Sequence, residues 1–177
     1  MNRESVVLLD ELNTLKEKAF EPLSLPCSDF IGEPESQEYK ATGFTLNKKQ
    51  VQYRCAKITP TKIGQFVTLW KRDGAGEDIR PYHVRDNLDL AIIATRQGAR
   101  KGYFIFPLGA LKKQGIVQDI KPGKRGFRVY PIWDKPTSKQ AIKTQLWQLE
   151  YFFEVPAGGE LNLESIKPLF SCVSLAC

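Results

Sequence analysis

The residue types that could do chemistry in this sequence are mainly those that bind phosphate. The segment 57–72 reads KITPTKIGQFVTLWKR, with a loop between two predicted strands. On that loop, the hydroxyls of Thr59 and Thr61 and the ammonium group of Lys62 can donate to phosphate oxygens. Gln65 and Thr68, on the strand that follows, can both donate and accept, as a side chain that reads base edges must.

The same segment ends in an aromatic ring beside two cations, Trp70-Lys71-Arg72. This arrangement suits contact with a nucleic acid, whose bases stack on aromatic rings and whose phosphates attract cations. A second interpretation stays open, in which Trp70 is a core residue and Lys71-Arg72 is a solvated strand end.

Two further basic clusters, 96–101 (RQGARK) and 121–128 (KPGKRGFR), combine glycine with Lys and Arg. Glycine lets main-chain amides approach a phosphate closely, although each cluster alone could be an ordinary solvated turn. Neither cluster has the G-x-x-x-x-G-K-[ST] pattern of a P-loop, so we predict no nucleotide hydrolysis.

The charge of the chain is concentrated in its middle. Residues 40–143 hold 22 Lys and Arg against 7 Asp and Glu, whereas residues 1–39 hold 3 against 9, and residues 146–177 hold 1 against 4. A basic block of this density attracts polyanions and releases counterions when it meets a phosphate backbone. Nucleic acid is therefore the partner that the composition favours.

Catalytic and metal-binding patterns are weak. His83 is the single histidine, and the cysteines are irregularly spaced without a C-x-x-C pair, so we expect reduced thiols, no metal site and no cofactor (Cys27, Cys55, Cys172, Cys177). A metal-dependent nuclease is the enzymatic alternative, and it would use Asp86, Asp89 or Glu38 as carboxylate ligands. The strand after Asp89 carries no carboxylate, however, and Glu38-Tyr39-Lys40 is the one literal E-x-K.

The length of 177 residues suits one domain with a real core. No stretch reaches the length of a membrane span, and the first 20 residues lack the features of a signal peptide, so we expect a cytoplasmic protein. We divide the chain into an acidic arm at 1–39, with a helix around Val6, Leu9, Leu12 and Leu15, and a main domain at 40–177.

The elements that must position the basic residues are mostly strands. We predict strands at 42–46, 50–58, 64–71, 88–95, 102–106 and 127–131, a hairpin turn at 47–49 and a short helix at 107–114. Successive strands without intervening helices indicate an α+β protein with a curled antiparallel sheet or an open barrel. Gly115 should end the short helix, and the tail after 161 should pack back on the body.

A second helix is predicted to begin near Thr137, where TSKQ fits a capping box. Ile142, Leu146, Leu149 and Phe153 follow at helical spacing and form its expected apolar face.

Three strings within residues 40–153 resemble the MepB family of small bacterial proteins: ITPTKIGQFVTLWKR at 58–72, GYFIFPL at 102–108 with Leu111 and Gly115-Ile116, and KRGFRVYPIW at 124–133. Members of that family look similar in fold to the DNA-binding pseudobarrel, a curled seven-stranded sheet that binds duplex DNA with strands and loops of one open face. The resemblance implies an open pseudobarrel here and a DNA-binding role for the basic and polar residues inside or beside the strings, and it implies no catalytic residue. These residues are Lys57, Lys62, Gln65, Trp70, Lys71, Arg72, Lys101, Lys124, Arg125 and Arg128.

The leading hypothesis is thus a protein that binds nucleic acid, with double-stranded DNA as the expected ligand, through a basic concave face. The nuclease described above is the alternative. A further alternative is a protein-interaction module, whose acidic N-terminal helix docks a partner or folds over the basic face and inhibits it.

Overall fold

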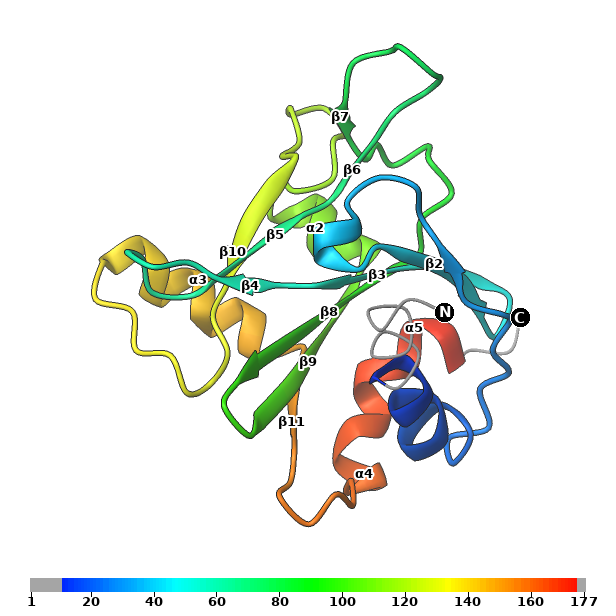
Figure 1. The fold of residues 1–177 in the computed structure, drawn as a ribbon, viewed down its shortest axis with the longest axis vertical. Helices are drawn as coiled ribbons and strands as arrows, with labels where there is room; N and C mark the ends of the chain where they lie inside the picture. The colour runs from blue at the N-terminus through cyan, green and yellow to red at the C-terminus, as the bar shows by residue number, and fades with distance from the viewer. Residues whose placement is uncertain (1–10, 175–177) are drawn as a thin grey trace.

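The structure, a computed structural model, describes residues 11–174, in which strands form three sheets with short helices around them (Figure 1). The six-stranded sheet runs in the order β1 (Ile31–Gly32), β2 (Thr42–Leu46), β3 (Lys49–Cys55), β8 (Leu90–Gln97), β9 (Arg100–Pro107) and β11 (Phe152–Val155). The three-stranded sheet has the order β10 (Gly126–Val129), β5 (Gln65–Thr68) and β4 (Lys57–Ile58). A two-stranded arm pairs β6 (Trp70–Lys71) with β7 (Arg80–Pro81).

The helical segments are short and lie outside the sheets. They are η1 (Lys16–Phe20), η2 (Gln37–Tyr39), α2 (Leu108–Lys113), α3 (Lys139–Leu149), α4 (Leu163–Ile166), η3 (Lys167–Phe170) and α5 (Ser171–Ser174). The α+β class and the open, strand-rich arrangement are confirmed.

One ladder of the large sheet differs from the antiparallel expectation, because β3 and β8 are parallel, with Val51 opposite Leu90. A parallel pair needs a long crossover. Here the crossover is the chain from 56 to 89, which contains β4, β5, β6 and β7. The strands are also divided among three sheets rather than joined in one curled seven-stranded sheet.

The large sheet is buried on both faces. Along β8, Leu90 and Ile92 pack into one core, whereas Ala91 and Ile93 pack into the other. This agrees with the nearly continuous apolar sequence of the strand, since a strand covered on one side would alternate apolar and polar residues.

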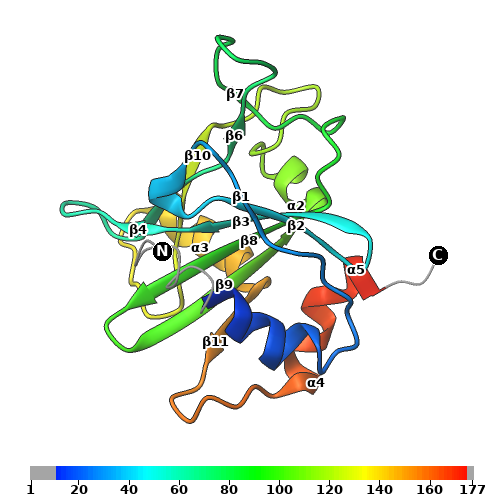
Figure 2. The ribbon, with the colours of Figure 1, turned by 45° about the vertical axis from the view of Figure 1, so that its right-hand side comes forward.

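The first core lies between the sheet and the two ends of the described chain. Leu12 and Phe20 are fully buried there, and the Phe20 ring lies 5.9 Å from the Phe170 ring. Figures 1 and 2 show the N-terminal helix beside α4 and α5 on the same side of the sheet. The tail therefore packs back on the body, as predicted, and the described part of the acidic arm contributes to the core. The predicted contributions of Val6 and Leu9 lie outside the described residues.

Two predicted strands are each split in two. The strand predicted at 50–58 ends at Cys55, and after Ala56 the chain joins the three-stranded sheet as β4. The strand predicted at 64–71 divides at Leu69, so that Trp70 and Lys71 pair with β7 in the arm. A strand that changes sheets turns a corner, and the pattern of alternation does not reveal where the corner lies.

The predicted hairpin turn is present between β2 and β3. Asn47 and Lys48 both have positive φ values, 48° and 68°, as a two-residue type I′ turn requires. Gly115 has a φ of 68° and follows α2, as predicted for a residue that ends a helix.

The apolar face predicted for the second helix is wrong. Ile142 and Leu146 on α3 are 42% and 66% exposed, whereas Gln148 is fully buried. The helix begins after Ser138, whose side chain accepts from the Ala141 amide, and it ends before Phe153, which lies in β11. The buried face is set by hydrogen bonds to β10 that the apolar pattern does not show.

Candidate nucleic-acid interface

A groove between β10 and α3 has the composition expected of a polyanion-binding surface. Its volume is about 670 Å³, and fifteen residues line it, none of them acidic. Four of the fifteen are cations, Lys62, Lys124, Arg128 and Lys143. The potential inside such a groove is positive because no carboxylate on its walls offsets the four charges.

Two loop segments, one strand and one helix bring these cations together. Lys62 lies on the loop between β4 and β5, Lys124 lies just before β10, and Arg128 lies within β10. Lys143 comes from α3, where Gln140, Lys143, Thr144 and Trp147 share one face at helical spacing and line the same groove.

The groove exists because two glutamines hold α3 against the end of β10. Gln148 accepts from the Tyr130 amide at 2.8 Å and donates to the Arg128 carbonyl at 2.8 Å. Gln145 donates to the Pro131 carbonyl at 3.0 Å and to the Asp134 carbonyl at 2.8 Å. Buried main-chain amides and carbonyls need hydrogen-bond partners. The two glutamine side chains supply these partners to main-chain groups at 128–134 to which no neighbouring strand supplies them.

The cations of the groove differ in whether other protein groups bind them. Within residues 11–174, Lys62, Lys124 and Lys143 take part in no ion pair, and all three are exposed. Arg128 donates to the Thr59 hydroxyl at 2.8 Å and to the Gly64 carbonyl at 3.3 Å. Its guanidinium group is thus held by neutral acceptors, and no ion pair within residues 11–174 includes it.

The aromatic rings of the groove are mainly structural. Trp147 packs on Phe106 with ring centroids 5.3 Å apart, and Phe127 and Tyr130 are buried. We therefore assign the groove's binding capacity to its cations and to its hydroxyl and amide groups.

Trp70, Lys71 and Arg72 lie together at the arm, away from the groove. Lys71 pairs with Asp86 at 3.6 Å, and Arg72 donates to Glu35 at 3.0 Å while lying 5.8 Å from the Trp70 ring. The structure thus engages both cations with carboxylates and leaves Trp70 half-buried.

Gln65 does not reach the surface. Its side chain is 2% exposed, and its amide nitrogen donates to the Arg96 carbonyl at 3.0 Å. The amide therefore faces the protein interior rather than a nucleic-acid groove.

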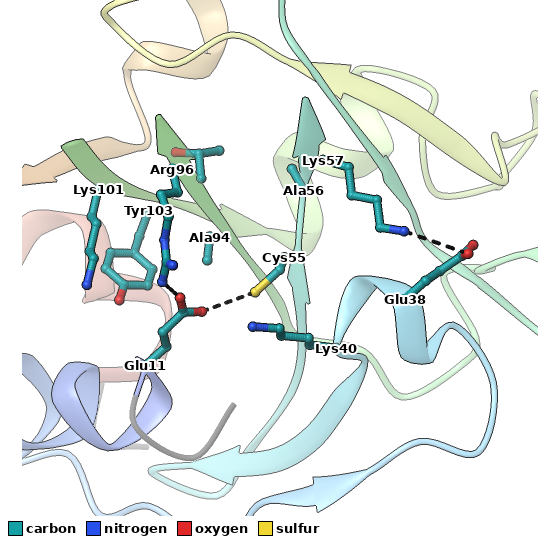
Figure 3. Close-up of a pocket in the computed structure, with 11 residues that line it drawn as sticks. Glu11, Glu38, Lys40, Cys55, Ala56, Lys57, Ala94, Arg96, Lys101 and Tyr103 are labelled. Atoms are coloured by element: carbon teal, nitrogen blue, oxygen red, sulfur yellow. Dashed lines mark hydrogen bonds and ion pairs between the residues drawn. The ribbon is translucent and has the colours of Figure 1, made fainter. Parts of the chain in front are cut away.

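A second, smaller pocket of about 220 Å³ gathers Lys57, Lys101 and Arg96 with acidic residues of the N-terminal segment (Figure 3). Glu11 forms an ion pair with Arg96, and Glu38 lies 3.7 Å from Lys57. Two of the predicted basic clusters are thus partly neutralised by carboxylates from residues 1–39. Lys101 and Arg125 are exposed and have no ion-pair partner within residues 11–174.

Cys55 points into the same pocket, toward Glu11 (Figure 3). Its sulfur lies 3.4 Å from a Glu11 carboxylate oxygen and 3.2 Å from the Tyr53 hydroxyl. Burial raises the pKa of the Cys55 thiol. The thiol form is therefore favoured at neutral pH, which is opposite to what a nucleophilic cysteine requires.

The three carboxylates that a nuclease would use as metal ligands are each bonded to or paired with another protein group. Asp86 accepts from Arg80 at 2.7 and 2.9 Å and from the His83 amide at 2.7 Å. Asp89 accepts from the Gln50 amide at 2.8 Å, and Glu38 faces Lys57. Within residues 11–174, no group of three or more His, Cys, Asp or Glu side chains is placed to hold a metal ion.

The sequence patterns did not predict a role for Lys143, Gln145 or Gln148. A signal for the first was present, since Gln140, Lys143, Thr144 and Trp147 share a polar helical face. The apolar residues Ile142 and Leu146 suggested the opposite face. The two glutamines gave no signal, because their role depends on backbone groups of β10 and of the segment 130–134, which lie 11 to 20 residues away in the chain.

Comparison with known proteins places the chain in a family. A family model described as MepB-like matches residues 33–154. The chain belongs to the MepB-like family. A solved structure titled as the crystal structure of MepB is 33% identical in sequence and has a TM-score of 0.70. The match covers 87% of this chain and 97% of that one.

The MepB-like family is thus shown by both sequence and fold, as the three strings at 58–72, 102–116 and 124–133 suggested. A bacterial homing endonuclease also matches, with a TM-score of 0.43 and 13% identity over 80% of this chain and 85% of that one, which is too distant to support an argument. No curated protein matches the chain. No helix within residues 11–174 is long and apolar enough to cross a bilayer.

Proposed function

We propose that this MepB-like protein binds nucleic acid, with duplex DNA as the main ligand, through the groove between β10 and α3. The observation that supports the proposal best is the composition of this groove, whose walls carry four cations and no carboxylate. A phosphate backbone that enters it meets Lys62, Lys124 and Lys143 with no competing ion pair among the described residues. A cytoplasmic location belongs to the same proposal.

The polar side chains of the groove add hydrogen bonds to this electrostatic attraction. Gln140 and Thr144 line it from α3, and their donors and acceptors suit sugar, phosphate or base edges. Lys101 and Arg125 are exposed cations outside the groove and can extend the contact. We place Trp70, Lys71 and Arg72 at the margin of the proposed interface, because both cations are already paired.

The test is fluorescence anisotropy of a labelled random duplex, titrated at several salt concentrations. Each phosphate neutralised by a cation contributes about 0.9 to the slope of log affinity against log salt. The double variant Lys62→Gln/Lys124→Gln should weaken binding and lower the slope by about 2.

Lys48→Gln/Lys167→Gln is the matched control, because it removes the same charge from exposed lysines that do not line the groove. The neighbouring Asn47 donates to the Val173 carbonyl, which places that turn beside the C-terminal helices. Equal losses in the two double variants would show that only net charge matters and would refute the groove as the binding site. The absence of binding by the unaltered protein at low salt would refute the proposed function.

A further inference from the structure

A buried arginine on β3 lies outside the proposed groove. Arg54 is 2% exposed, and burial lowers the pKa of its guanidinium group. Its Nη1 atom donates to the Gln52 side chain and to the Tyr53 carbonyl, both at 2.9 Å. Its Nε atom is buried and has no hydrogen-bond partner among residues 11–174. No ion pair within the same residues includes Arg54.

This arginine lines a hollow of about 600 Å³ between β3, the loop 33–36 and the arm formed by β6 and β7. Tyr82 and Arg85 line the hollow from the loop after β7, and Trp70 lines it from β6. The Nη1 side of the guanidinium group is fixed by protein acceptors. The Nε side is therefore the part of the guanidinium group that has no protein acceptor among the described residues.

Most acidic residues on the walls of the hollow pair with Arg or Lys side chains other than Arg54. Glu35 accepts from Arg72 at 3.0 Å, and Asp86 is held by Arg80 and Lys71. Glu33 is the remaining carboxylate. It accepts from the Gln52 amide at 3.4 Å, and its charge partly offsets the lowering of the Arg54 pKa by burial, although the two side chains form no ion pair within residues 11–174. Arg85 is exposed and enters no ion pair within residues 11–174.

The chemistry of these donors selects an oxyanion. A buried cation is costly without a counter-charge, and a guanidinium edge matches two oxygens of a phosphate or carboxylate. Burial raises the pKa of the Tyr82 phenol, although the charge of Arg54 opposes this, so the phenol keeps its proton and can donate at neutral pH. Arg54 from β3 and Tyr82 and Arg85 from the loop after β7 supply several donors to one hollow, which suits the three terminal oxygens of a phosphate group better than the two of a carboxylate.

We propose that this hollow binds a single phosphate group through Arg54, Tyr82 and Arg85. A duplex backbone is too wide to bring its phosphates to a side chain that is 2% exposed. The phosphate is therefore inorganic phosphate, a phosphate monoester or the terminal phosphate of an oligonucleotide. Trp70 lies where a base attached to such a phosphate could stack. This site does not depend on duplex binding in the groove.

The experiment is isothermal titration calorimetry of the full chain with inorganic phosphate, a nucleoside 5′-monophosphate and the matching nucleoside. We expect the two phosphate compounds to bind and the nucleoside to bind at least about tenfold more weakly, because it lacks the charged acceptor. Single-stranded oligonucleotides with and without a 5′-phosphate then distinguish the sources. A preference for the phosphorylated strand assigns the site to nucleic-acid ends, and no preference assigns it to small phosphates.

The variants Arg54→Lys, Tyr82→Phe and Arg85→Gln should each weaken phosphate binding, with Arg54→Lys losing about tenfold or more because it removes the guanidinium edge. Arg100→Gln is the control, since that arginine lies on β9 and pairs with Glu154. Arg85 is exposed, so its variant tests the site even if Arg54→Lys does not fold.

The proposal is overturned if inorganic phosphate does not bind, or if it binds equally to the folded variants and to the control. The groove variant Lys62→Gln/Lys124→Gln should bind phosphate in the hollow as the unaltered protein does. Failure of DNA binding and failure of this site are therefore seen in different experiments.

Discussion

Asp86 should stabilise the fold by holding the β6–β7 arm, and its charge can be tested directly. The carboxylate accepts from Arg80 at 2.7 and 2.9 Å and from the His83 amide at 2.7 Å, and Lys71 lies 3.6 Å away. Hydrogen bonding to Arg80 lowers the pKa of Asp86 from 3.8 to about 2. The side chain is 13% exposed, so solvent screens this network only in part.

The size of the effect follows from the difference in pKa between the folded and unfolded chains. A difference of nearly two corresponds to about 2 kcal/mol of stability when the carboxylate is ionised in both states. As the pH falls below 3.8, the unfolded chain takes up the proton first, while the folded chain keeps the charge until about pH 2. The contribution is therefore complete above pH 3.8 and is lost as the pH falls toward 2.

The assay is urea unfolding of the unaltered protein and of Asp86→Asn across this pH range. The variant should be less stable by about 2 kcal/mol near neutral pH and by about 1 kcal/mol at about pH 3. Asp73→Asn is the matched control, because Asp73 pairs with the same Arg80 at 2.7 Å but its side chain is 61% exposed. That control should show a much smaller change.

Two results would contradict this reasoning. A stability difference that stays constant between neutral pH and about pH 3 would mean that the asparagine acts through shape rather than through lost charge. An equal effect of Asp73→Asn would mean that burial of the Asp86 carboxylate does not matter.

Three further predictions concern the groove and its surroundings. Gln148→Leu should destabilise the protein by about 2–4 kcal/mol in urea unfolding, because it leaves a buried amide and a carbonyl at the end of β10 without partners. Gly64→Ala should destabilise it by about 1–3 kcal/mol in the same assay, because Gly64 has a φ of +86° and an added Cβ would lie 2.6 Å from the Tyr130 ring. Glu35→Gln/Glu38→Gln should raise affinity for a duplex at low salt in the anisotropy assay, because it frees two cations of the basic block. The gain should disappear at high salt, and a loss of affinity would show that these carboxylates do not compete with DNA.

Much of the local structure could be predicted from residue types. The strand at 42–46 was predicted with its bounds, and the apolar run around Ile92 and Ile93 correctly indicated a strand buried on both faces. The turn at Asn47 and the helix end at Gly115 follow from the preferences of single residues for positive φ. Such features depend on neighbours in the sequence, so a pattern of residues can reveal them.

The errors occurred where the chain meets distant parts of itself. The breaks at Ala56 and Leu69 arise because a continuous β pattern passes from one sheet to another. The orientation of α3 was wrong because Gln148 and Gln145 bond the backbone near β10, which outweighs the exposure of Ile142 and Leu146.

The candidate site likewise has features that residue types reveal and features that depend on contacts between distant parts of the chain. Residue types alone show that a dense basic block exists and that Lys62, Lys124 and Arg128 belong to it, and the three strings that resemble the MepB-like family lie within the residues that its model matches. The tertiary structure decided which charges remain free, because ion pairs such as Arg72 with Glu35 join residues far apart in the chain. It also placed Gln65 inside, added Lys143 to the groove and placed Arg54, with its Nε atom buried and without an acceptor among the described residues, at the wall of a hollow. Charge is a property of composition, whereas its availability depends on which groups the fold brings within a few ångströms.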